Sequence, residues 1–177
     1  MTGLNPDTEE IIEIFCIITT GTLDVVDEEG WGTVVRQTKE RMDMMDEWCT
    51  KTHAGSGLTA RVIASTVTPE QAADELLAYI KRFVPERKMA LLAGNSVHAD
   101  RAFLRKEPYK KVVEHLHHRI LDVSTIKEAA RRWCPKEVRR NAPVKQGLHQ
   151  AKEDILESIA EAQYYKEAIF ENRRSSE

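Results

Sequence analysis

The sequence predicts a single α/β domain in which helices flank a mixed β-sheet. Two segments rich in β-branched residues come first, at residues 11–20 and 33–37, and short apolar segments then alternate with amphipathic helical patterns. Strands followed by such an alternation are typical of a sheet with both antiparallel and parallel pairs. Because 177 residues, 41% of them hydrophobic, are enough for one core, we expect a single domain over residues 1–177. Its polar tail, residues 173–177, should be poorly ordered.

The first two strands should pair as an antiparallel hairpin or meander. The segment at residues 11–20 (IIEIFCIITT) has the composition of a buried strand, and the one at residues 33–37 (TVVRQ) follows a glycine-rich bend. A helical pattern over residues 42–53 comes next and ends at a Gly-Ser-Gly breaker, which predicts a loop. That pattern places three apolar side chains on one side of the helix: Met45, Trp48 and Cys49.

The clearest helix start in the chain is at Thr68. Thr68 is a favourable N-cap, Pro69 takes the first helical position and Glu70 makes the first turn acidic, so we predict a helix over residues 69–83. The remaining pattern predicts strands at residues 89–93 and 117–123, helices at residues 100–105, 126–133 and 149–172, and a loop at residues 135–147.

The charge balance excludes one class of nucleic-acid-binding protein. The formal net charge is −3, whereas proteins that coat long nucleic acids rely on many Lys and Arg contacts to phosphates. A substrate with few phosphates is compatible with this charge. Basic residues do gather between Arg131 and Lys145, where they form either a solvated face or the rim of an anion site, and of the two we favour the solvated face.

The sequence also indicates a reducing compartment and no membrane span. No apolar segment approaches the ~20 residues needed to cross a bilayer, and the first residues match neither a secretory signal nor a mitochondrial presequence. Cys16, Cys49 and Cys134 are odd in number and irregularly spaced, which is typical of free thiols. We therefore expect the cytoplasm or the mitochondrial matrix.

Three polar residues are candidates for catalysis or ligand binding because of their positions next to predicted strands and helices. Asp100 follows a polar turn beyond a strand end, a place where open α/β sheets bind ligands. His149 opens the last predicted helix and Asp154 follows about one and a half turns later, so both could face one cleft. Taken separately, each has an ordinary structural explanation, as a capping histidine or as an acid that stabilises a helix dipole.

Taken together, three motifs in chain order are far more specific than any one of them. They are Gly-Asn-Ser-x-x-x-Asp at residues 94–100, His-x-Arg-x-Leu-Asp-Val-Ser-Thr at residues 117–125 and His-x-x-x-x-Asp at residues 149–154. Further matching segments are Met-Thr-Gly-Leu at residues 1–4, Ile-Ile-Glu-Ile at residues 11–14, Trp48, Ser-Gly-Leu at residues 56–58 and Arg-Arg-Trp at residues 131–133. In these segments the chain resembles, over essentially its whole length, the oligoribonucleases of the exonuclease superfamily named for four acidic residues and a histidine.

The resemblance implies a ribonuclease-H-like fold, a homodimer and a metal-dependent 3′-to-5′ exoribonuclease activity. Family members degrade short single-stranded RNA, down to the dinucleotide, into 5′-mononucleotides. On the matching positions, Asp100 and Asp154 would be metal ligands and His149 the general base that deprotonates the attacking water. Two Mg²⁺ or Mn²⁺ ions are the implied cofactors, since such ions can generate hydroxide and stabilise the leaving oxygen.

The resemblance also implies contacts to the bases of the RNA. Leu4 and Trp48 would act as apolar wedges against the bases, with His53 nearby; the alternative for Leu4 and Trp48 is ordinary core packing. His118 stands where the family commonly has a tyrosine that reaches into the active site of the partner subunit. A histidine keeps a ring that can stack but titrates near neutral pH, which would alter the pH dependence.

The terminal phosphate of the substrate would be held by Ser96, Arg119, Ser124 and Thr125. For Ser124 and Thr125 helix capping is the alternative, and capping can coexist with phosphate binding at the same helix end. A closed pocket with a few charge-assisted contacts and base stacking would explain how a net-acidic protein binds short RNA.

The start of the chain departs from the family pattern. In the family, a strand ending in Asp-Leu-Glu precedes the Met-Thr-Gly-Leu segment, supplies two metal-binding acids and lies in the middle of the sheet, whereas this chain starts at Met1. Asp7, Glu9, Glu10 and Glu13 are not positioned to replace those acids. We expect a site with two of its four carboxylates, an opened core and impaired activity. We interpret this start as a mis-called codon or a shortened polypeptide in preference to a natural short protein.

Two other functions are compatible with the same residues. A catalytically silent protein of this fold could bind short nucleic acid or a protein partner without holding both metals. A deoxyribonuclease or proofreading relative would share the catalytic pattern, but the matches outside the catalytic residues favour the oligoribonucleases.

Overall fold

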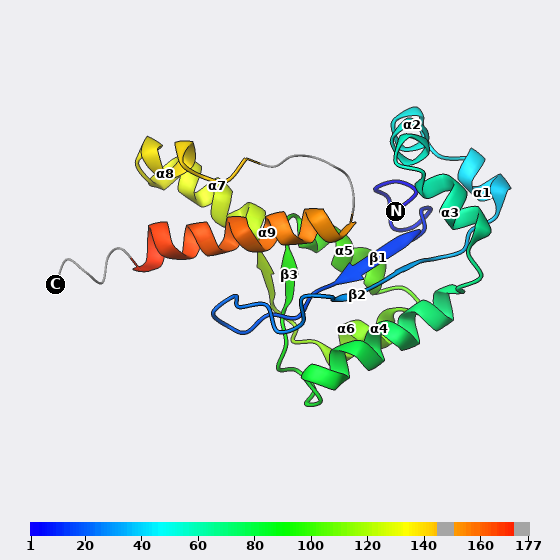
Figure 1. Ribbon diagram of the computed structural model, residues 1–177, viewed down its shortest axis with the longest axis horizontal. Coiled ribbons are helices and arrows are strands. Elements are labelled where there is room, and N and C mark those ends of the chain that lie inside the picture. Colours follow the sequence, from blue (N-terminus) through cyan, green and yellow to red (C-terminus); the bar gives the residue numbers. More distant parts are fainter. Residues whose placement is uncertain (145–150, 172–177) are drawn as a thin grey trace.

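The computed structural model describes residues 1–144 and 151–171 (Figure 1). The strands are β1 (Glu13–Cys16), β2 (Trp31–Val34), β3 (Leu92–Gly94) and β4 (Ile120–Asp122). The helices are α1 (Lys39–Asp43), α2 (Glu47–Gly55), α3 (Leu58–Ala64), α4 (Pro69–Phe83), α5 (Val97–Leu104), α6 (Lys110–His115), α7 (Val123–Trp133), α8 (Lys136–Arg140), α9 (Ala151–Tyr165) and the π-helical η1 (Lys166–Glu171). Of the helices in these two ranges, none is both long and apolar enough to cross a membrane.

The strands pair in both directions, which confirms the predicted α/β class with mixed pairing. β1 runs antiparallel to β2, with Glu13 opposite Val34. β3 runs parallel to β4, with Leu92 opposite Ile120. Within the described residues these pairs are two separate two-stranded sheets, so contacts between side chains, and not backbone hydrogen bonds, hold one pair next to the other.

One apolar cluster brings the two sheets side by side. Ile14 of β1 and Leu92 of β3 both pack against it, and it includes Tyr79 and Ile80 of α4 and Val112 of α6. In Figure 1, α4 and α6 lie on one side of the strands and α9 crosses on the other. Helix α9 contacts both β1 and β3. Helices therefore cover the strands from both sides, as expected for this fold class.

The three short helices α1–α3 close a second cluster around the residues just before β1. Ile12 is fully buried there, at 0% exposed, against Met42 of α1, Cys49 of α2 and Val62 of α3. Because its neighbours come from three separate helices, Ile12 holds the N-terminal segment and these helices together.

The helix predicted over residues 42–53 is divided in two by a helix cap. The Asp46 carboxylate accepts a hydrogen bond from the Cys49 N–H at 2.7 Å and so begins α2. Trp48, in the first turn of α2, is 63% exposed. Met45 and Cys49 are buried, at 8% and 6% exposed, so Trp48 does not share their buried surroundings.

Other elements are predicted well where the sequence carries a strong local signal. Thr68 is the N-cap of α4, its hydroxyl accepts from the Gln71 N–H, and Pro69 is the first residue, as predicted. The predicted strands are all longer than the strands observed. The end of the last predicted helix at residue 172 and the predicted tail at residues 173–177 lie outside the described residues.

Three helices, α3, α6 and α8, lie where the sequence predicts none. Helix α3 shows why: Gly57 has a φ of 72° and makes the turn between α2 and α3, so the glycine breaker separates two helices and does not begin a loop. Leu58 and Val62, one turn apart, are buried at 5% and 0% exposed. Burial of these side chains, which depends on the rest of the fold, stabilises a helix that is short in isolation.

Replacing Ile12 with alanine should lower the free energy of unfolding by about 2–5 kcal/mol, because the change removes buried carbon atoms and leaves a cavity. The smaller change Ile12→Val should cost about 0.5–1.5 kcal/mol. Urea denaturation followed by circular dichroism measures both values. If the two variants were equally stable, the tight packing around Ile12 would be disproved.

Candidate active site

The candidate site begins where β3 and β4 end. Because these strands are parallel, with Gly94 opposite Asp122, their carboxyl ends meet at one edge. The Asp122 carboxylate joins the two chain segments that leave this edge. Its Oδ1 accepts hydrogen bonds from the backbone N–H groups of Ser96 and Ser124, each at 3.0 Å.

Asp122 also pairs with a histidine, and the combination keeps its carboxylate ionised. Its Oδ2 lies 3.1 Å from Nδ1 of His98, and its side chain is only 9% exposed. Burial by itself would raise the pKa of Asp122, but the hydrogen bonds from His98, Ser96 and Ser124 outweigh burial and lower the pKa below its ordinary value. Asp122 is the N-cap of α7, so Ser124, which the sequence predicts as part of the cap, lies inside the helix.

The hydroxyl groups of Ser96 and Ser124 lie together at this junction. Ser124 Oγ accepts from the Ser96 N–H at 3.0 Å, and the two Oγ atoms are 3.2 Å apart. Ser96 adopts the left-handed conformation, with a φ of 53°, which is strained for a residue with a side chain. Two of the residues predicted to hold a phosphate are therefore neighbours in space.

Asn95 connects this junction to α9. Its Nδ2 donates to Ser158 Oγ at 3.0 Å and to Glu161 Oε2 at 3.1 Å, while its Oδ1 accepts from Ser124 at 3.3 Å. Ser158 in turn donates to the backbone carbonyl of Asp154 at 2.7 Å. Asp154 therefore lies on a turn of α9 that is tied through Ser158 to the loop before α5.

Glu161, a buried residue of α9, connects this helix to α7. It is 1% exposed and pairs with Lys127 of α7 at 2.9 Å. The hydrogen bond to Glu161 raises the pKa of Lys127 and keeps the ammonium charged. Sequence reasoning assigned no role to Asn95, Asp122, Ser158 or Glu161, although Asn95 and Asp122 belong to the matched motifs, and only the fold brings the four together.

Asp100 lies in the first turn of α5, close to this junction. Its side chain reaches solvent, but partial burial raises the pKa of the carboxyl group above its ordinary value. The negative charge of Asp122 acts in the same direction, whereas His98 opposes it. A carboxylate in such a setting is stabilised by a nearby cation. This electrostatic property is compatible with the predicted role of Asp100 as a metal ligand.

The other predicted catalytic residues are only partly described. Asp154 is in the first turn of α9, and His149 lies outside the described residues. Within the parts of the chain that the structure covers, no three His, Cys, Asp or Glu side chains come close enough together to hold a metal ion. The described residues alone therefore do not make a site for two divalent ions.

Of the predicted base-contacting residues, Leu4 lies in the N-terminal segment and Trp48 and His53 lie on α2. Leu4 and Trp48 are 85% and 63% exposed, so the alternative of core packing is excluded for both. His53 of α2 lies 3.1 Å from the backbone carbonyl of Met1 and so connects α2 to the segment that carries Leu4. Burial is the main reason why the pKa of His53 is lowered, which favours a neutral ring.

His118 and Arg119 are exposed and lie apart from the two serines, whereas Thr125, which is also exposed, follows Ser124 in the first turn of α7. His118 stacks on His117, with ring centroids 4.3 Å apart, and the Arg119 N–H donates to His117 Nδ1 at 3.0 Å. Arg119 precedes β4 and Asp122 ends it, which separates them by about 10 Å at the usual rise of a strand. Within this chain, therefore, Arg119 stands at the opposite end of β4 from the Ser96–Ser124 pair.

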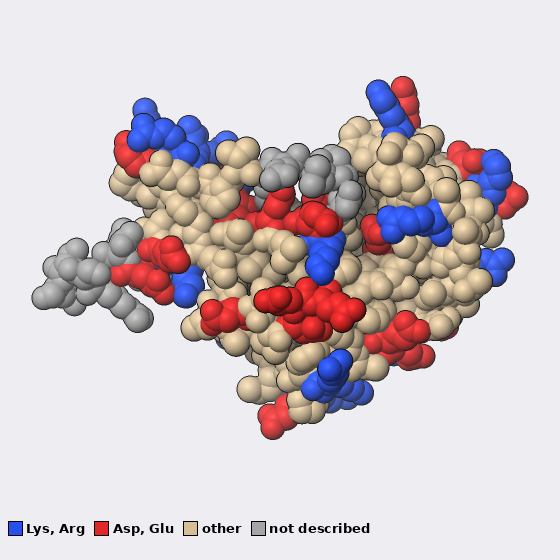
Figure 2. Space-filling model, viewed as in Figure 1, with Lys and Arg blue, Asp and Glu red and all other residues tan. Residues whose placement is uncertain are grey.

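Charge is unevenly distributed over the surface. On the face in Figure 2, acidic side chains gather near the middle, and basic ones gather over α8. Arg131 and Arg132 of α7 both pair with Glu128 on their own helix and are exposed. This pairing agrees with the prediction that the basic segment is a solvated face; Lys145 lies outside the described residues.

Comparison with known proteins agrees with this arrangement. The exonuclease family model matches residues 1–162. The chain is 46% identical to the probable oligoribonuclease of Schizosaccharomyces pombe, over 94% of this chain and 64% of that protein. It is 48% identical to the mitochondrial oligoribonuclease of Saccharomyces cerevisiae, over 93% of this chain and 63% of that protein. It is 45% identical to the oligoribonuclease of Vibrio cholerae, over 96% of this chain and 91% of that protein.

An α/β fold with both strand directions and a family match over residues 1–162 define the class of this protein: the chain belongs to the exonuclease family. Its similarity to oligoribonucleases from yeasts and a bacterium, over 93–96% of its length, confirms the predicted group within that family. The chain spans slightly less than two thirds of the two yeast relatives, 64% and 63%.

Removing the Asp122 carboxylate should disrupt the junction between β3 and β4. Asp122→Ala leaves two backbone N–H groups and His98 without their acceptor, so we expect a loss of about 2–3 kcal/mol in the free energy of unfolding. The control Asp43→Ala removes a solvent-exposed ion pair with Lys39 and should change stability by less than about 1 kcal/mol. Urea denaturation measures both variants.

The effect of Asp122 should also depend on pH. Because folding lowers its pKa, its stabilisation is fully present above the ordinary pKa of about 3.9 and is lost as the pH falls through the folded-state pKa. The stability difference between wild type and Asp122→Ala should therefore shrink between about pH 6 and about pH 3. A difference that stayed constant over this range would rule out an ionised Asp122 as the stabilising group.

Proposed function

We propose that the protein is a 3′-to-5′ exoribonuclease that hydrolyses short oligoribonucleotides to 5′-mononucleotides. The observation that carries this proposal is the 45% identity to a bacterial oligoribonuclease over 91% of that protein's length. The arrangement at the ends of β3 and β4 supports it, because the matched motifs at residues 94–100 and 117–125 meet there in space.

The described side chains suit a short RNA substrate. The hydroxyl groups of Ser96 and Ser124 can donate to the oxygens of a terminal phosphate, and Thr125 lies beside them on the exposed side of the first turn of α7. Exposed Leu4 and Trp48 offer apolar surface against which bases can stack, each stacked base contributing about 1–3 kcal/mol. A few such contacts are enough for a net-acidic chain to bind a short RNA without a long basic groove.

Hydrolysis by this family implies two Mg²⁺ or Mn²⁺ ions, which when bound supply a more acidic water and stabilise the leaving oxygen. In this proposal Asp100 and Asp154 would each be a metal ligand, and His149 would accept the proton of the attacking water. The described residues hold no cluster of three metal-binding side chains, so they do not by themselves fit two ions. Because Asp100 and Asp154 are the two carboxylates that match the metal-binding positions of the family, we propose that the 177-residue polypeptide by itself hydrolyses RNA poorly.

The same observation favours a second function. A protein of this fold whose carboxylates cannot hold two ions would still present the Ser96–Ser124 pair and the exposed Trp48, and so could bind short nucleic acid, or a partner, without cleaving it. The two functions are separated by measuring binding and turnover on one substrate.

We also propose a homodimer in which His118 and Arg119 of one subunit approach the site of the other. Its support is the position of both residues at the far end of β4 from Ser96 and Ser124, about 10 Å away along the strand. Both are exposed and so can meet a second subunit.

Light scattering should give a mass twice the 20.2 kDa of one chain. A monomer at micromolar concentration would contradict the dimer. The variant His118→Tyr, which restores the ring usual in the family, should leave the mass unchanged.

The compartment proposed for this protein is the cytoplasm or the mitochondrial matrix. Cys16, Cys49 and Cys134 are free thiols, as is usual under reducing conditions. The names of the Saccharomyces cerevisiae and Mus musculus relatives include the word mitochondrial.

Activity can be tested with a labelled RNA dinucleotide. The 177-residue chain should release mononucleotides very slowly, and a polypeptide extended before Met1 by a strand ending in Asp-Leu-Glu should release them rapidly with Mg²⁺ or Mn²⁺. The reason is electrostatic, because two carboxylates offset only part of the charge of two divalent ions. Vigorous cleavage by the unextended chain, abolished by Asp154→Ala, would overturn this expectation.

The role of His149 can be separated from binding in the extended polypeptide. His149→Ala should reduce turnover by about 100-fold or more, as for loss of a general base, while dinucleotide affinity stays within a few-fold of wild type. Fluorescence anisotropy without added metal measures the affinity. Equal losses in affinity and turnover would assign His149 to substrate binding and not to proton transfer.

A further inference from the structure

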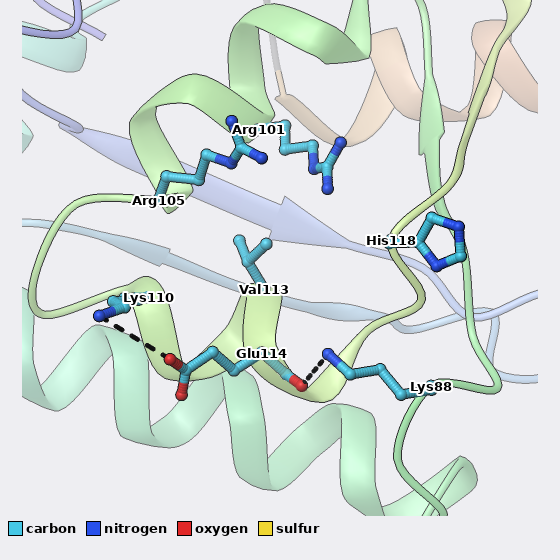
Figure 3. Close-up of a pocket in the computed structure, with 7 residues that line it drawn as sticks. All are labelled: Lys88, Arg101, Arg105, Lys110, Val113, Glu114 and His118. Atoms are coloured by element: carbon cyan, nitrogen blue, oxygen red, sulfur yellow. Dashed lines mark hydrogen bonds and ion pairs between the residues drawn. The ribbon is translucent and has the colours of Figure 1, made fainter.

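The basic side chains of this protein differ in how many acceptors they reach. In the cavity drawn in Figure 3, no dashed line joins Arg101 or Arg105 to another of the residues shown, and His118 in the same cavity belongs to the contact of the proposed dimer. Arg41 of α1 is the opposite case. Its Nη2 donates to three acceptors at distances of 2.6–2.9 Å. All three belong to the N-terminal segment, so Arg41 joins α1 to that segment.

The three acceptors lie on both sides of Leu4 in the chain. They are the Thr2 hydroxyl group at 2.8 Å, the backbone carbonyl of Thr8 at 2.9 Å and Glu9 Oε2 at 2.6 Å. Residues 2–9 therefore form a closed loop, here called the Leu4 loop, and one guanidinium group holds both of its ends. A guanidinium group suits this role because its donors have a fixed, planar geometry.

Thr2 makes the closure of the Leu4 loop specific. It is 1% exposed, and its hydroxyl group uses its one donor and both of its acceptor positions. The hydroxyl donates to Glu9 Oε2 at 2.5 Å and accepts from the Glu10 N–H at 2.9 Å as well as from Arg41. A buried hydroxyl group that loses a partner is destabilising, so the loop is favoured in this closed form.

Glu9 completes the closure as an ionised carboxylate. The hydrogen bond from Thr2 is the main cause that lowers the pKa of Glu9; burial opposes it, and Arg41 adds to the lowering. Gly3 leaves room for this side chain, because a Cβ atom at Gly3 would lie 2.9 Å from Cδ of Glu9. The contacts of Glu9 thus give it a structural role in the Leu4 loop.

The Leu4 loop carries one of the two exposed apolar side chains that the proposed function places against the RNA bases. Leu4 is 85% exposed, and Trp48 of α2 is 63% exposed. His53, also on α2, lies 3.1 Å from the Met1 carbonyl, and Figure 1 shows the N-terminal segment next to this helix. The segment is therefore tied to α1 by Arg41 and to α2 by His53. Ordering a loop before its ligand arrives lowers the entropy cost of binding.

We propose that Arg41 is a positioning residue, which fixes Leu4 relative to Trp48 and so determines how tightly the bases of a short RNA are held. This inference rests on the proposed function, in which Leu4 and Trp48 contact the bases. It assigns part of the selection of a substrate with bases to a side chain that acts through the Leu4 loop and does not touch the RNA itself.

The test compares wild type with Arg41→Met, which keeps a straight side chain but removes the guanidinium group. Fluorescence anisotropy without added metal measures the affinity for a labelled RNA dinucleotide, which should fall about tenfold because the Leu4 loop is no longer ordered. An abasic dinucleotide, with the same ribose and phosphate groups, is measured by competition. Its affinity should stay within about twofold, since Leu4 acts on the bases alone.

Two further variants separate positioning from a general loss of structure. Arg41→Lys keeps a positive charge beside Glu9 and should bind the dinucleotide more tightly than Arg41→Met. The double variant Arg41→Met/Leu4→Ala should bind no more weakly than Leu4→Ala, because two changes that act through one side chain are not additive. Circular dichroism verifies that each variant is folded.

A matched control removes one positive charge from the same helix. Lys39 begins α1 and pairs with Asp43 on the exposed side, at 2.5 Å. Lys39→Met therefore changes the attraction for an anionic RNA as Arg41→Met does, but leaves the Leu4 loop closed. It should leave the dinucleotide affinity within about twofold of wild type.

The outcomes distinguish this inference from the proposed function. If neither Leu4→Ala nor Trp48→Ala weakens dinucleotide binding, or if wild type shows no saturable binding, both are overturned. If those two variants weaken binding and Arg41→Met does not, only the positioning role is overturned. Equal losses for the dinucleotide and its abasic analogue, or additive losses in the double variant, would also overturn it, because Arg41 would then act by its charge or through the stability of the fold.

Discussion

The site depends on a single buried carboxylate that joins two segments distant in sequence. Asp122 accepts from the backbone of Ser96 and Ser124 at 3.0 Å each, and these two residues follow the ends of two parallel strands. Strands of three residues, such as β3 and β4, offer few ladder hydrogen bonds of their own. The charge-assisted bonds of Asp122 therefore contribute a large share of what holds the strand ends in register. They also keep the hydroxyl groups of Ser96 and Ser124 together.

Helix α9 is held against this junction by polar contacts that are partly buried. Asn95 donates to both Ser158 and Glu161, and Glu161 pairs with Lys127. A buried carboxylate is stabilising only when its partners are present, because an unpaired charge in the interior is costly. The position of Asp154 on α9 is thus coupled to the loop that precedes Asp100. Asp100 lies on α5 and Asp154 on α9, yet one network of hydrogen bonds connects α9 to the loop before α5.

The net charge alone describes the surface of this protein poorly, because the charged side chains are unevenly distributed. The chain is net acidic, at −3, but Arg101 and Arg105 lie together in a cavity with only one carboxylate, whereas Arg131 and Arg132 are each paired on their own helix. Two clusters of like charge in the sequence can therefore differ in whether a neighbouring carboxylate neutralises them. Neutralisation by a neighbour one turn away makes a solvated face, and its absence leaves a potential that attracts anions.

The sequence by itself determined those features that depend on neighbours within a turn or two of the chain. It predicted α4 with its Thr68 cap, the antiparallel pairing of the first strands, and the order of motifs that identifies the family. Only the tertiary structure decided that Trp48 is exposed, that Asp122 holds the ends of β3 and β4 together, and that Asn95 bonds with Glu161. Caps and periodic patterns act locally and can be read from consecutive residues. Contacts such as that between Asn95 and Glu161, 66 residues apart, exist only after the chain has folded, because packing and burial select which polar groups meet.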